Sequence, residues 1–458
     1  MSLAIQRSGL TKEQETFISK HLTLVPVRDD FMSKKFNFQP KSNDGTVQFW
    51  KAEKDVVHLP LLFASAMFKK YPDPNTYPNA KMTFTGMLIK DEKKDQPAAM
   101  MEAWGHLQQF GTTTLSLYTG FGKTALGACA ACALGKVVLI TFTMTTLMKQ
   151  WADTFRKFTT ARIWVYGECP RNEVPHWSED TTEPPVDVII CMVERVPNIP
   201  KHIRDQVGTL ILDEAHLLCV PSAVPMFMSL HPCYIIAETA TLERDDDMHS
   251  MIVAVAGSHS VYRESKTPFN VFKVETNTTP DTSLNKLEGA KGWLDRETNV
   301  TQNLRRLTII SQLATHAYPE DAVLILTRHV PHAKAIAAML RSNGIDVQEY
   351  HSDMTSFKEC RVLVGTVSKI GTGFDQESQC SNFSGRRFRI LIIASSIKKK
   401  TQVVQCIGRV IFRCQNPVVL HLVDNYKTYK GHWREVEKIY KSRNGIIQKI
   451  SIPNPNNE

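Results

Sequence analysis

The sequence contains no long apolar segment and no sign of a disulfide framework. No run of eighteen apolar residues occurs in the 458-residue chain, which excludes an ordinary membrane-spanning helix. The segment Met1–Leu10 lacks the apolar core of a secretory signal peptide. The 10 cysteines are scattered, mostly in apolar contexts, as expected for buried thiols in a reducing compartment. We therefore expect an intracellular protein without a membrane partner.

Zinc ligands and repeats are also lacking. Cys129 and Cys132 have the two-residue gap of a zinc-binding pair, but no second pair stands at a suitable spacing, so we interpret them as packing residues.

The net charge of +9 fits a polyanionic partner, although many proteins that bind none share such a balance. The length and the 42% hydrophobic content allow two or three globular domains.

The segment Thr119-Gly-Phe-Gly-Lys-Thr124 is the most informative motif that is present. A buried strand is expected before it, over 112–117, and an alanine-rich helix after it, over 125–134. Gly120 and Gly122 would let backbone N–H groups face an anion at the start of that helix. The motif therefore predicts a phosphate-binding loop.

The last two residues of the loop would contact the nucleotide and its metal ion. Lys123 would reach the β- and γ-phosphates, and the Thr124 hydroxyl would bind Mg²⁺. The general phosphate-loop pattern has a glycine where Leu117 stands, so only the narrower form T-G-x-G-K-T is met. A Gly-Lys-Thr turn without function is the alternative, which the flanking strand and helix disfavour.

The segment Asp213-Glu-Ala-His216 supplies the acidic groups that such a site needs. It follows the apolar run 209–212, and a buried strand delivers side chains to its C-terminal edge, where ligands bind in open parallel sheets. Asp213 would hold Mg²⁺, and Glu214 would orient and deprotonate the attacking water. The alternative is an acidic pair that stabilises a helix N-terminus through the helix dipole.

Two sets of apolar segments, separated by polar helical stretches, predict two α/β domains in tandem. Strands apolar on both faces indicate parallel sheets covered by helices on both sides. We predict an N-terminal accessory domain over 1–94, a first α/β domain over 95–265 and a second over 266–458. The polar tail 442–458 is expected to pack only partly. The segments are 137–143, 186–192, 209–212 and 234–237, then 322–327, 361–366, 389–395 and 418–423.

The second half carries motifs that complete a known order. Val364 to Asp375 contains Thr366 and three glycines, and Gln405-Cys-Ile-Gly-Arg409 opens an expected helix. From roughly Gln96 to Tyr440 the chain resembles the superfamily 2 helicases of the DEAH-box type. The resemblance implies two RecA-like domains, ATP and Mg²⁺ as cofactors, and a nucleic acid as partner.

The resemblance also assigns residues to the nucleotide. Gln96 would read the adenine, Thr119 would belong to the phosphate loop, and Asp375 would lie near the ribose or the cleft between the domains. Gln405 would act in catalysis, and Arg409 would stabilise transition-state charge as an arginine finger.

Other residues would serve the nucleic acid and the coupling of hydrolysis to movement. Gln150 and Thr366 would contact the nucleic-acid backbone. His216 and the pair Thr239 and Thr241 would couple hydrolysis to domain movement.

Two positions depart from the family pattern. Leu242 stands where close relatives usually have proline. Phe412 replaces a second arginine, and Arg413 follows one position later. A shift of one residue on a helix rotates a side chain by about 100°. Either Arg413 still serves as a second finger on a distorted helix, or Arg409 acts alone.

Within the superfamily, the segment 418–440 resembles a branch that includes the excision-repair and transcription-factor helicase, a phage recombination helicase and the late-transcription helicases of large DNA viruses. The connection 351–361, which is shorter than in cellular relatives, and the segment 57–63 resemble the viral members most. The resemblance implies 3′→5′ movement on DNA, or RNA as the alternative polymer, in viral transcription, replication or repair. Transcription or repair proteins are implied as partners, and host cytoplasm, viral factory or virion as the location.

Two other functions stay open at this point, and one is disfavoured. A translocase that never separates strands would share these motifs, and so would a nucleotide-gated adaptor with little turnover. A phosphate-loop kinase would not need a second sheet that carries Gln405 and Arg409. The sequence leaves the oligomeric state open.

Overall fold

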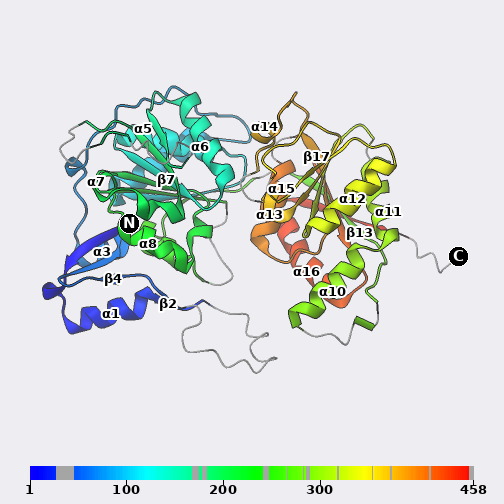
Figure 1. Cartoon of the computed structure of the whole chain (residues 1–458), viewed down its shortest axis with the longest axis horizontal. Coiled ribbons are helices and arrows are strands. Elements are labelled where there is room, and N and C mark those ends of the chain that lie inside the picture. Colours follow the sequence, from blue (N-terminus) through cyan, green and yellow to red (C-terminus); the bar gives the residue numbers. More distant parts are fainter. Residues whose placement is uncertain are drawn as a thin grey trace. The chain divides into compact units, whose positions relative to one another are not determined.

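The chain divides into two compact units, Met1–Arg263 and Glu264–Glu458, which Figure 1 shows in blue to green and in green to red. The computed structural model describes residues 1–26, 46–167, 175–177, 183–240, 247–265, 267–281, 283–284, 289–316, 319–352, 354–371, 374–411 and 414–452. Among these residues, no helix is long and apolar enough to span a bilayer.

The first unit begins with a small antiparallel sheet in the order β1-β5-β4 and a two-stranded sheet of β2 and β3. The Thr11 side chain and Gln14 form a capping box that starts α1. The elements are β1 (Ser2–Gln6), η1 (Arg7–Gly9), α1 (Lys12–Leu22), β2 (Thr23–Leu24), β3 (Val47–Gln48), β4 (Lys51–Ala52), β5 (Val56–Pro60), α3 (Leu61–Phe68) and η2 (Pro74–Thr76).

This N-terminal part shares its hydrophobic core with the large sheet that follows. The backbone N–H of Ser2 donates to the Leu230 carbonyl at 2.9 Å, and the Phe49 and Phe227 rings meet edge to face at 5.1 Å. The same core cluster contains Val57 and Leu59 together with residues of β10 and β11. Residues 1–94 thus lie within the first unit, and a separately folding accessory domain stays a prediction.

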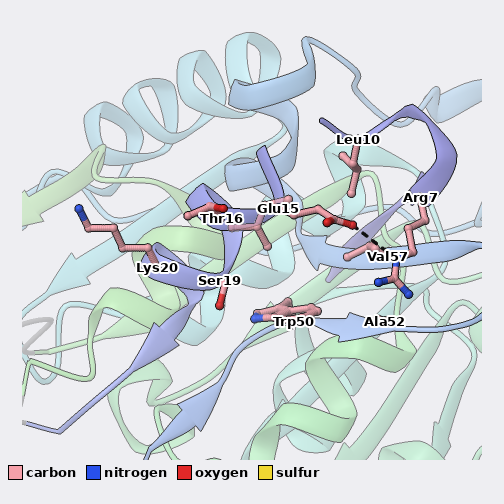
Figure 2. Close-up of a pocket in the computed structure, with 10 residues that line it drawn as sticks. Arg7, Leu10, Glu15, Thr16, Ser19, Lys20, Trp50, Ala52 and Val57 are labelled. Carbon is pink, nitrogen blue, oxygen red and sulfur yellow. Dashed lines mark ion pairs between the residues drawn. The ribbon is translucent and has the colours of Figure 1, made fainter. Parts of the chain in front are cut away.

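A pocket of about 520 Å³ lies in this N-terminal part, lined by residues of α1, β4 and β5 (Figure 2). Trp50 forms part of the lining, and Arg7 pairs with Glu15 at 3.5 Å beside it. The pocket is formed by elements other than the phosphate loop and the acidic segment.

The main sheet of the first unit is seven-stranded and parallel, in the order β12-β6-β11-β10-β7-β9-β8. Its central strands are fully buried, as the near-continuous apolar runs predict. The strands are β6 (Thr112–Leu117), β7 (Val138–Phe142), β8 (Ile163–Val165), β9 (Val188–Met192), β10 (Thr209–Leu212), β11 (Tyr234–Thr239) and β12 (Ser260–Arg263).

The helices of this unit include α4, where the Asp95 side chain caps the N-terminus by accepting from the Ala98 N–H. They are α4 (Gln96–Phe110), α5 (Lys123–Leu134), α6 (Thr145–Phe158), η3 (Val193–Asn198), α7 (Lys201–Arg204), η4 (Ala215–Leu218), η5 (Pro221–Ala223), α8 (Val224–Ser229) and α9 (Ser250–Ala256).

The second unit is built on another seven-stranded parallel sheet, in the order β15-β16-β14-β17-β18-β13-β19. Apolar clusters cover its two faces. The strands are β13 (Phe269–Glu275), β14 (Ala322–Thr327), β15 (Val347–Tyr350), β16 (Val362–Thr366), β17 (Phe388–Ile393), β18 (Val418–Val423) and β19 (Gly445–Ser451), and the helices are α10 (Gly289–Thr301), α11 (Leu304–Thr315), α12 (Val330–Ser342), α13 (Val367–Gly371), α14 (Gln376–Gln379), α15 (Lys400–Ile411) and α16 (Lys427–Ser442).

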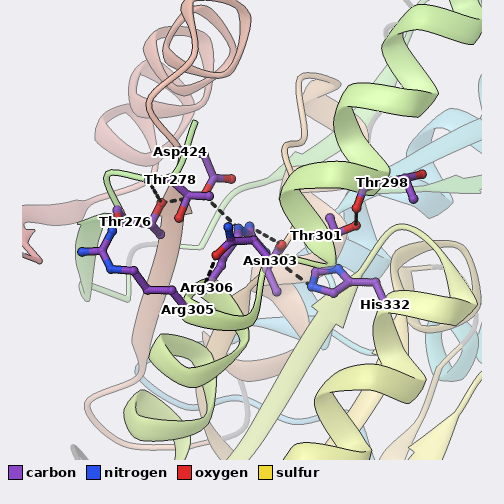
Figure 3. A network of polar contacts seen from close by, with 10 residues as sticks. Thr276, Thr278, Thr298, Thr301, Asn303, Arg305, Arg306, His332 and Asp424 are labelled. Carbon is purple, nitrogen blue, oxygen red and sulfur yellow. Dashed lines mark hydrogen bonds and ion pairs between the residues drawn. The ribbon is translucent and has the colours of Figure 1, made fainter. Parts of the chain in front are cut away.

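A buried polar network ties together the C-terminal edge of this second sheet (Figure 3). The Arg306 guanidinium, which is 1% exposed, donates to Asp424 at 2.8 Å and to the Ala394 carbonyl at 2.7 Å. Asp424 also accepts from the Thr276 hydroxyl at 2.6 Å. Arg306 and Asp424 together thereby join the segments that follow β13, β17 and β18.

The polar tail contains a strand that the sequence did not predict. Gly445–Ser451 forms β19, which pairs in parallel with β13 along its whole length. The alternation of exposed and half-buried residues in β19 fits an edge strand with one face on the core.

Candidate nucleotide site

The phosphate loop lies between β6 and α5, as its sequence predicts. Gly120 and Gly122 have φ values of 87° and 103°, in the left-handed region that glycine adopts without strain. Lys123 is the first residue of α5, and its ammonium donates to the Leu117 carbonyl at 3.1 Å. The loop thus joins two glycines and a lysine at a helix N-terminus, an arrangement that binds anions.

Gln96 holds this loop against the preceding segment. Its side-chain amide N–H donates to the Phe121 carbonyl at 2.6 Å, and its amide oxygen accepts from the Ile89 N–H at 2.7 Å. The side chain is buried beneath Gly122. The amide keeps a second N–H and a second lone pair, so reading of an adenine by Gln96 stays a prediction.

Asp213 lies at the C-terminal end of β10 and is fixed from two sides. The Trp151 indole N–H donates to its Oδ2 at 2.8 Å, and the Glu214 N–H donates to its Oδ1 at 2.8 Å. Burial raises the pKa of the Asp213 carboxyl above its ordinary value, and the charge of Glu214 raises it further. A nearby cation would favour the ionised form that binds metal.

Glu214 has a strained backbone, with φ 46° and ψ 50° in the left-handed region. Its Oε2 is buried without a hydrogen bond among the described residues, and Nδ1 of His216 lies 3.5 Å from it. A buried carboxylate oxygen in this state is available to a water molecule.

His216 and Thr239, both predicted as coupling residues, are in direct contact. The His216 Nδ1 and the Thr239 hydroxyl are 2.9 Å apart, and both side chains are buried. Because Thr239 ends β11 and His216 follows β10, the hydrogen bond joins two neighbouring strand ends. Thr241, Leu242 and the residues up to 246 lie outside the described part of the chain.

The second-unit motif residues gather at one loop of their own domain. The Arg409 guanidinium donates to the carbonyls of Gly371 and Phe374, each at 2.6 Å. Gln405 lies on the same helix, α15, with its Oε1 near Gly371. Asp375 caps α14 by accepting from the Ser378 N–H at 3.2 Å.

Thr366 is the last residue of β16 and is buried, and β16 pairs with β14. Phe412 and Arg413 lie outside the described residues, so the choice between one and two arginine fingers stays open.

Comparison with known proteins agrees with this geometry. Residues 96–247 match the DEAD/DEAH box helicase family. Protein 161L of Invertebrate iridescent virus 6, named as a helicase, is 26% identical over 425 residues, which cover 87% of this chain and 90% of that protein. Protein 055L of Frog virus 3, also named as a helicase, is 26% identical over 361 residues and covers 77% and 78%. Residues 96–247 thus carry a DEAD/DEAH box helicase domain.

The fold of this helicase agrees with that family. The solved structure of S. cerevisiae Dbp5 bound to RNA and ADP BeF3 has a TM-score of 0.55 at 12% identity, over 77% of this chain and 89% of that one. The predicted architecture of two tandem RecA-like domains is thereby confirmed. The matched helicase domain and the helicase relatives support a nucleic-acid-dependent ATPase.

The donor set of the helicase fits ATP with Mg²⁺. A threonine hydroxyl, Thr124, and a carboxylate, Asp213, are the hard oxygen ligands that Mg²⁺ prefers, and Mg²⁺ takes its other ligands from phosphates and waters. Within the described ranges, no three or more His, Cys, Asp or Glu side chains form a metal site by themselves. The cysteine pair Cys129 and Cys132 accordingly belongs to no such cluster.

Gln150 lies closer to the nucleotide loop than its predicted role implies. Its side-chain Nε2 donates to the Thr124 hydroxyl at 3.2 Å, so the residue lies beside a predicted metal ligand. A contact of Gln150 with nucleic acid stays a prediction.

Two site residues were missed by sequence reasoning. Trp151 anchors Asp213, and Glu238 is a fully buried acid on β11. A charged residue inside an otherwise apolar strand is the signal that could have identified Glu238.

Proposed function

We propose that this helicase hydrolyses ATP at the loop 119–124 to move along DNA in the 3′→5′ direction and to separate its strands. The proposed setting is transcription, replication or repair in a large DNA virus. The observation that carries the proposal is the meeting of Asp213, Glu214 and the His216–Thr239 pair at the strand ends beside the phosphate loop. The first two supply the chemistry and the last two supply a link from the acidic segment to β11.

Each residue of the first unit has a distinct task in this proposal. Lys123 and the backbone N–H groups of the loop bind the phosphates. Thr124 and Asp213 would hold Mg²⁺, which would neutralise developing phosphate charge. Glu214 orients the attacking water and accepts its proton, and its unsatisfied Oε2 supports that task.

The second unit contributes its own residues to the same reaction. Arg409 stabilises transition-state charge and Gln405 supports it, while Asp375 serves the nucleotide. Thr366 contacts the nucleic-acid backbone, and Thr241 couples hydrolysis to movement. Backbone contacts make binding largely independent of base sequence and sensitive to salt.

The experiment that tests the proposal measures ATP hydrolysis with and without single-stranded DNA. We expect stimulation by DNA in the native chain and a loss of about 100-fold or more in Glu214→Gln, because a positioned general base contributes about 10²–10⁴-fold. Glu435→Gln on α16, an exposed carboxylate paired with Lys438, is the matched control and should hydrolyse normally. Retained turnover in Glu214→Gln would contradict the assigned base.

The same preparation separates the alternatives. Duplexes with a 3′ or a 5′ single-stranded tail, made of DNA or RNA, test polarity and the preferred polymer. Stimulated hydrolysis without strand separation would favour a translocase. ATP binding without turnover would favour the nucleotide-gated adaptor.

A further inference from the structure

Glu238 is a fully buried carboxyl in the middle of the sheet of the first unit. It lies on β11, where it pairs with Leu115 of β6, and the preceding Ala237 pairs with Leu212 of β10. Its side chain is 0% exposed, and neither carboxyl oxygen has a hydrogen-bond partner within the described part of the chain. An unsatisfied buried acid is rare in a folded protein and calls for an explanation.

The position of the Glu238 carboxyl relates it to the phosphate-binding lysine. A Cβ atom added at Gly127 would lie 2.3 Å from Oε1 of Glu238, so the carboxyl occupies the space that this glycine leaves on α5. Gly127 is four residues after Lys123, and residues at this spacing lie on the same face of a helix. The carboxyl therefore lies one helical turn below Lys123.

The charges around Glu238 belong to the nucleotide site. Burial raises the pKa of Glu238 well above its ordinary value, the charges of Asp213 and Glu214 raise it as well, and Lys123 opposes them. The Lys123 ammonium has three N–H donors, one of which goes to the Leu117 carbonyl. A carboxyl oxygen accepts a hydrogen bond from an ammonium whether or not the acid is protonated.

We propose that Glu238 is a positioning residue of the ATP site, whose carboxyl accepts a hydrogen bond from Lys123 when nucleotide binds and orients the ammonium toward the phosphates. This inference rests on the proposed function, because it requires ATP at the loop 119–124. It also gives phosphate binding a direct route to β11, since Thr239 follows Glu238 and contacts His216.

Stability and nucleotide binding, measured on the same Glu238 variant, distinguish a functional acid from one without a function. Replacing an unsatisfied buried polar group by an apolar group of similar size stabilises a fold. Glu238→Leu should therefore raise the Tm of the nucleotide-free chain by about 2–4 °C. A variant that gains stability and loses nucleotide binding would identify the acid as functional.

The test uses the full chain and a fluorescent, non-hydrolysable ATP analogue with Mg²⁺. We expect Glu238→Leu to raise the Kd of the analogue about tenfold, a loss of about 1.4 kcal/mol. Glu238→Gln keeps an oxygen acceptor and should raise the Kd about threefold at most. In a Lys123→Ala background, Glu238→Leu should change the Kd no further, because the lysine that it orients is gone.

Three results would overturn the inference. These are an unchanged Kd in Glu238→Leu, a lowered Tm that points to a structural partner, and an effect that persists in full without Lys123. A native chain that fails to bind the analogue would instead refute the proposed ATP site. The two failures are therefore distinguishable.

Discussion

The side-chain amide of Gln96 connects the start of α4 to the phosphate loop, because one end bonds to Ile89 and the other to Phe121. A Cβ atom at Gly122 would lie 2.3 Å from the amide nitrogen of Gln96. The glycine therefore serves two purposes: it adopts the left-handed φ of the turn, and it leaves room for the amide that shapes the loop.

We predict that Gly122→Ala weakens ATP binding by at least tenfold. A non-glycine residue at φ 103° is strained, and its methyl group would displace Gln96. Gly135→Ala at the other end of α5 is the matched control. Gly135 also has a left-handed φ, of 62°, but an added Cβ there would meet nothing within 4 Å. Titration of both variants with an ATP analogue checks this, and equal losses would show that the loop contact is unimportant.

At the scale of elements, the edge strand β19 is held by side chains as well as by its ladder. Lys449 of β19 and Lys273 of β13 both pair with Glu275, at 2.8 Å and 2.6 Å. Burial raises the pKa of Glu275, but the hydrogen bonds and the charges of the two lysines together outweigh it and lower the pKa to about 2. One carboxylate thus crosslinks the last strand to its neighbour.

The sign of the pH dependence follows from this lowered pKa. Because the unfolded chain binds the proton more readily, the contribution of Glu275 is present above a pH of about 4.5 and is lost as the pH falls toward about 2. The group is partly exposed, so we expect at most about 1 kcal/mol.

Glu275→Gln should therefore lower the hydrogen-exchange protection factors of the β19 amides near pH 6. It should also remove most of the difference between the protection factors at pH 6 and at pH 3. Glu53→Gln, which removes a similar lysine pair in the first unit, should leave exchange in β19 unchanged. Unaltered exchange in Glu275→Gln would mean that the backbone ladder alone holds the strand.

At the scale of the whole molecule, the chain consists of two units with separate hydrophobic cores. The first core includes the N-terminal strands, and the second surrounds the sheet from β15 to β19. The proposed reaction nevertheless assigns ATP binding to the first unit and transition-state stabilisation to Arg409 in the second.

We predict that a fragment of residues 1–263 binds the ATP analogue yet shows no stimulation of hydrolysis by nucleic acid. It keeps Lys123, Thr124, Asp213 and Glu214 but lacks Gln405 and Arg409. Binding measured on the fragment and hydrolysis measured with and without DNA check this. Full DNA-stimulated turnover by the fragment would exclude a role for Arg409 in the reaction.

Much of the fold could be predicted from local sequence, because a buried parallel strand and a phosphate loop are each formed by consecutive residues. The segments 112–117, 209–212, 322–327 and 418–423 were predicted with the bounds that the structure has. The same locality explains why the order of motifs identified the helicase family.

The tertiary structure alone decided what depends on partners distant in the chain. β19 is a strand because β13 offers it an edge, and a polar alternating segment does not reveal that edge. Trp151 is a site residue because α6 brings its indole to Asp213 across 62 positions. The role proposed for Glu238 depends on the space at Gly127, and such a space exists only once the helix has packed on the sheet.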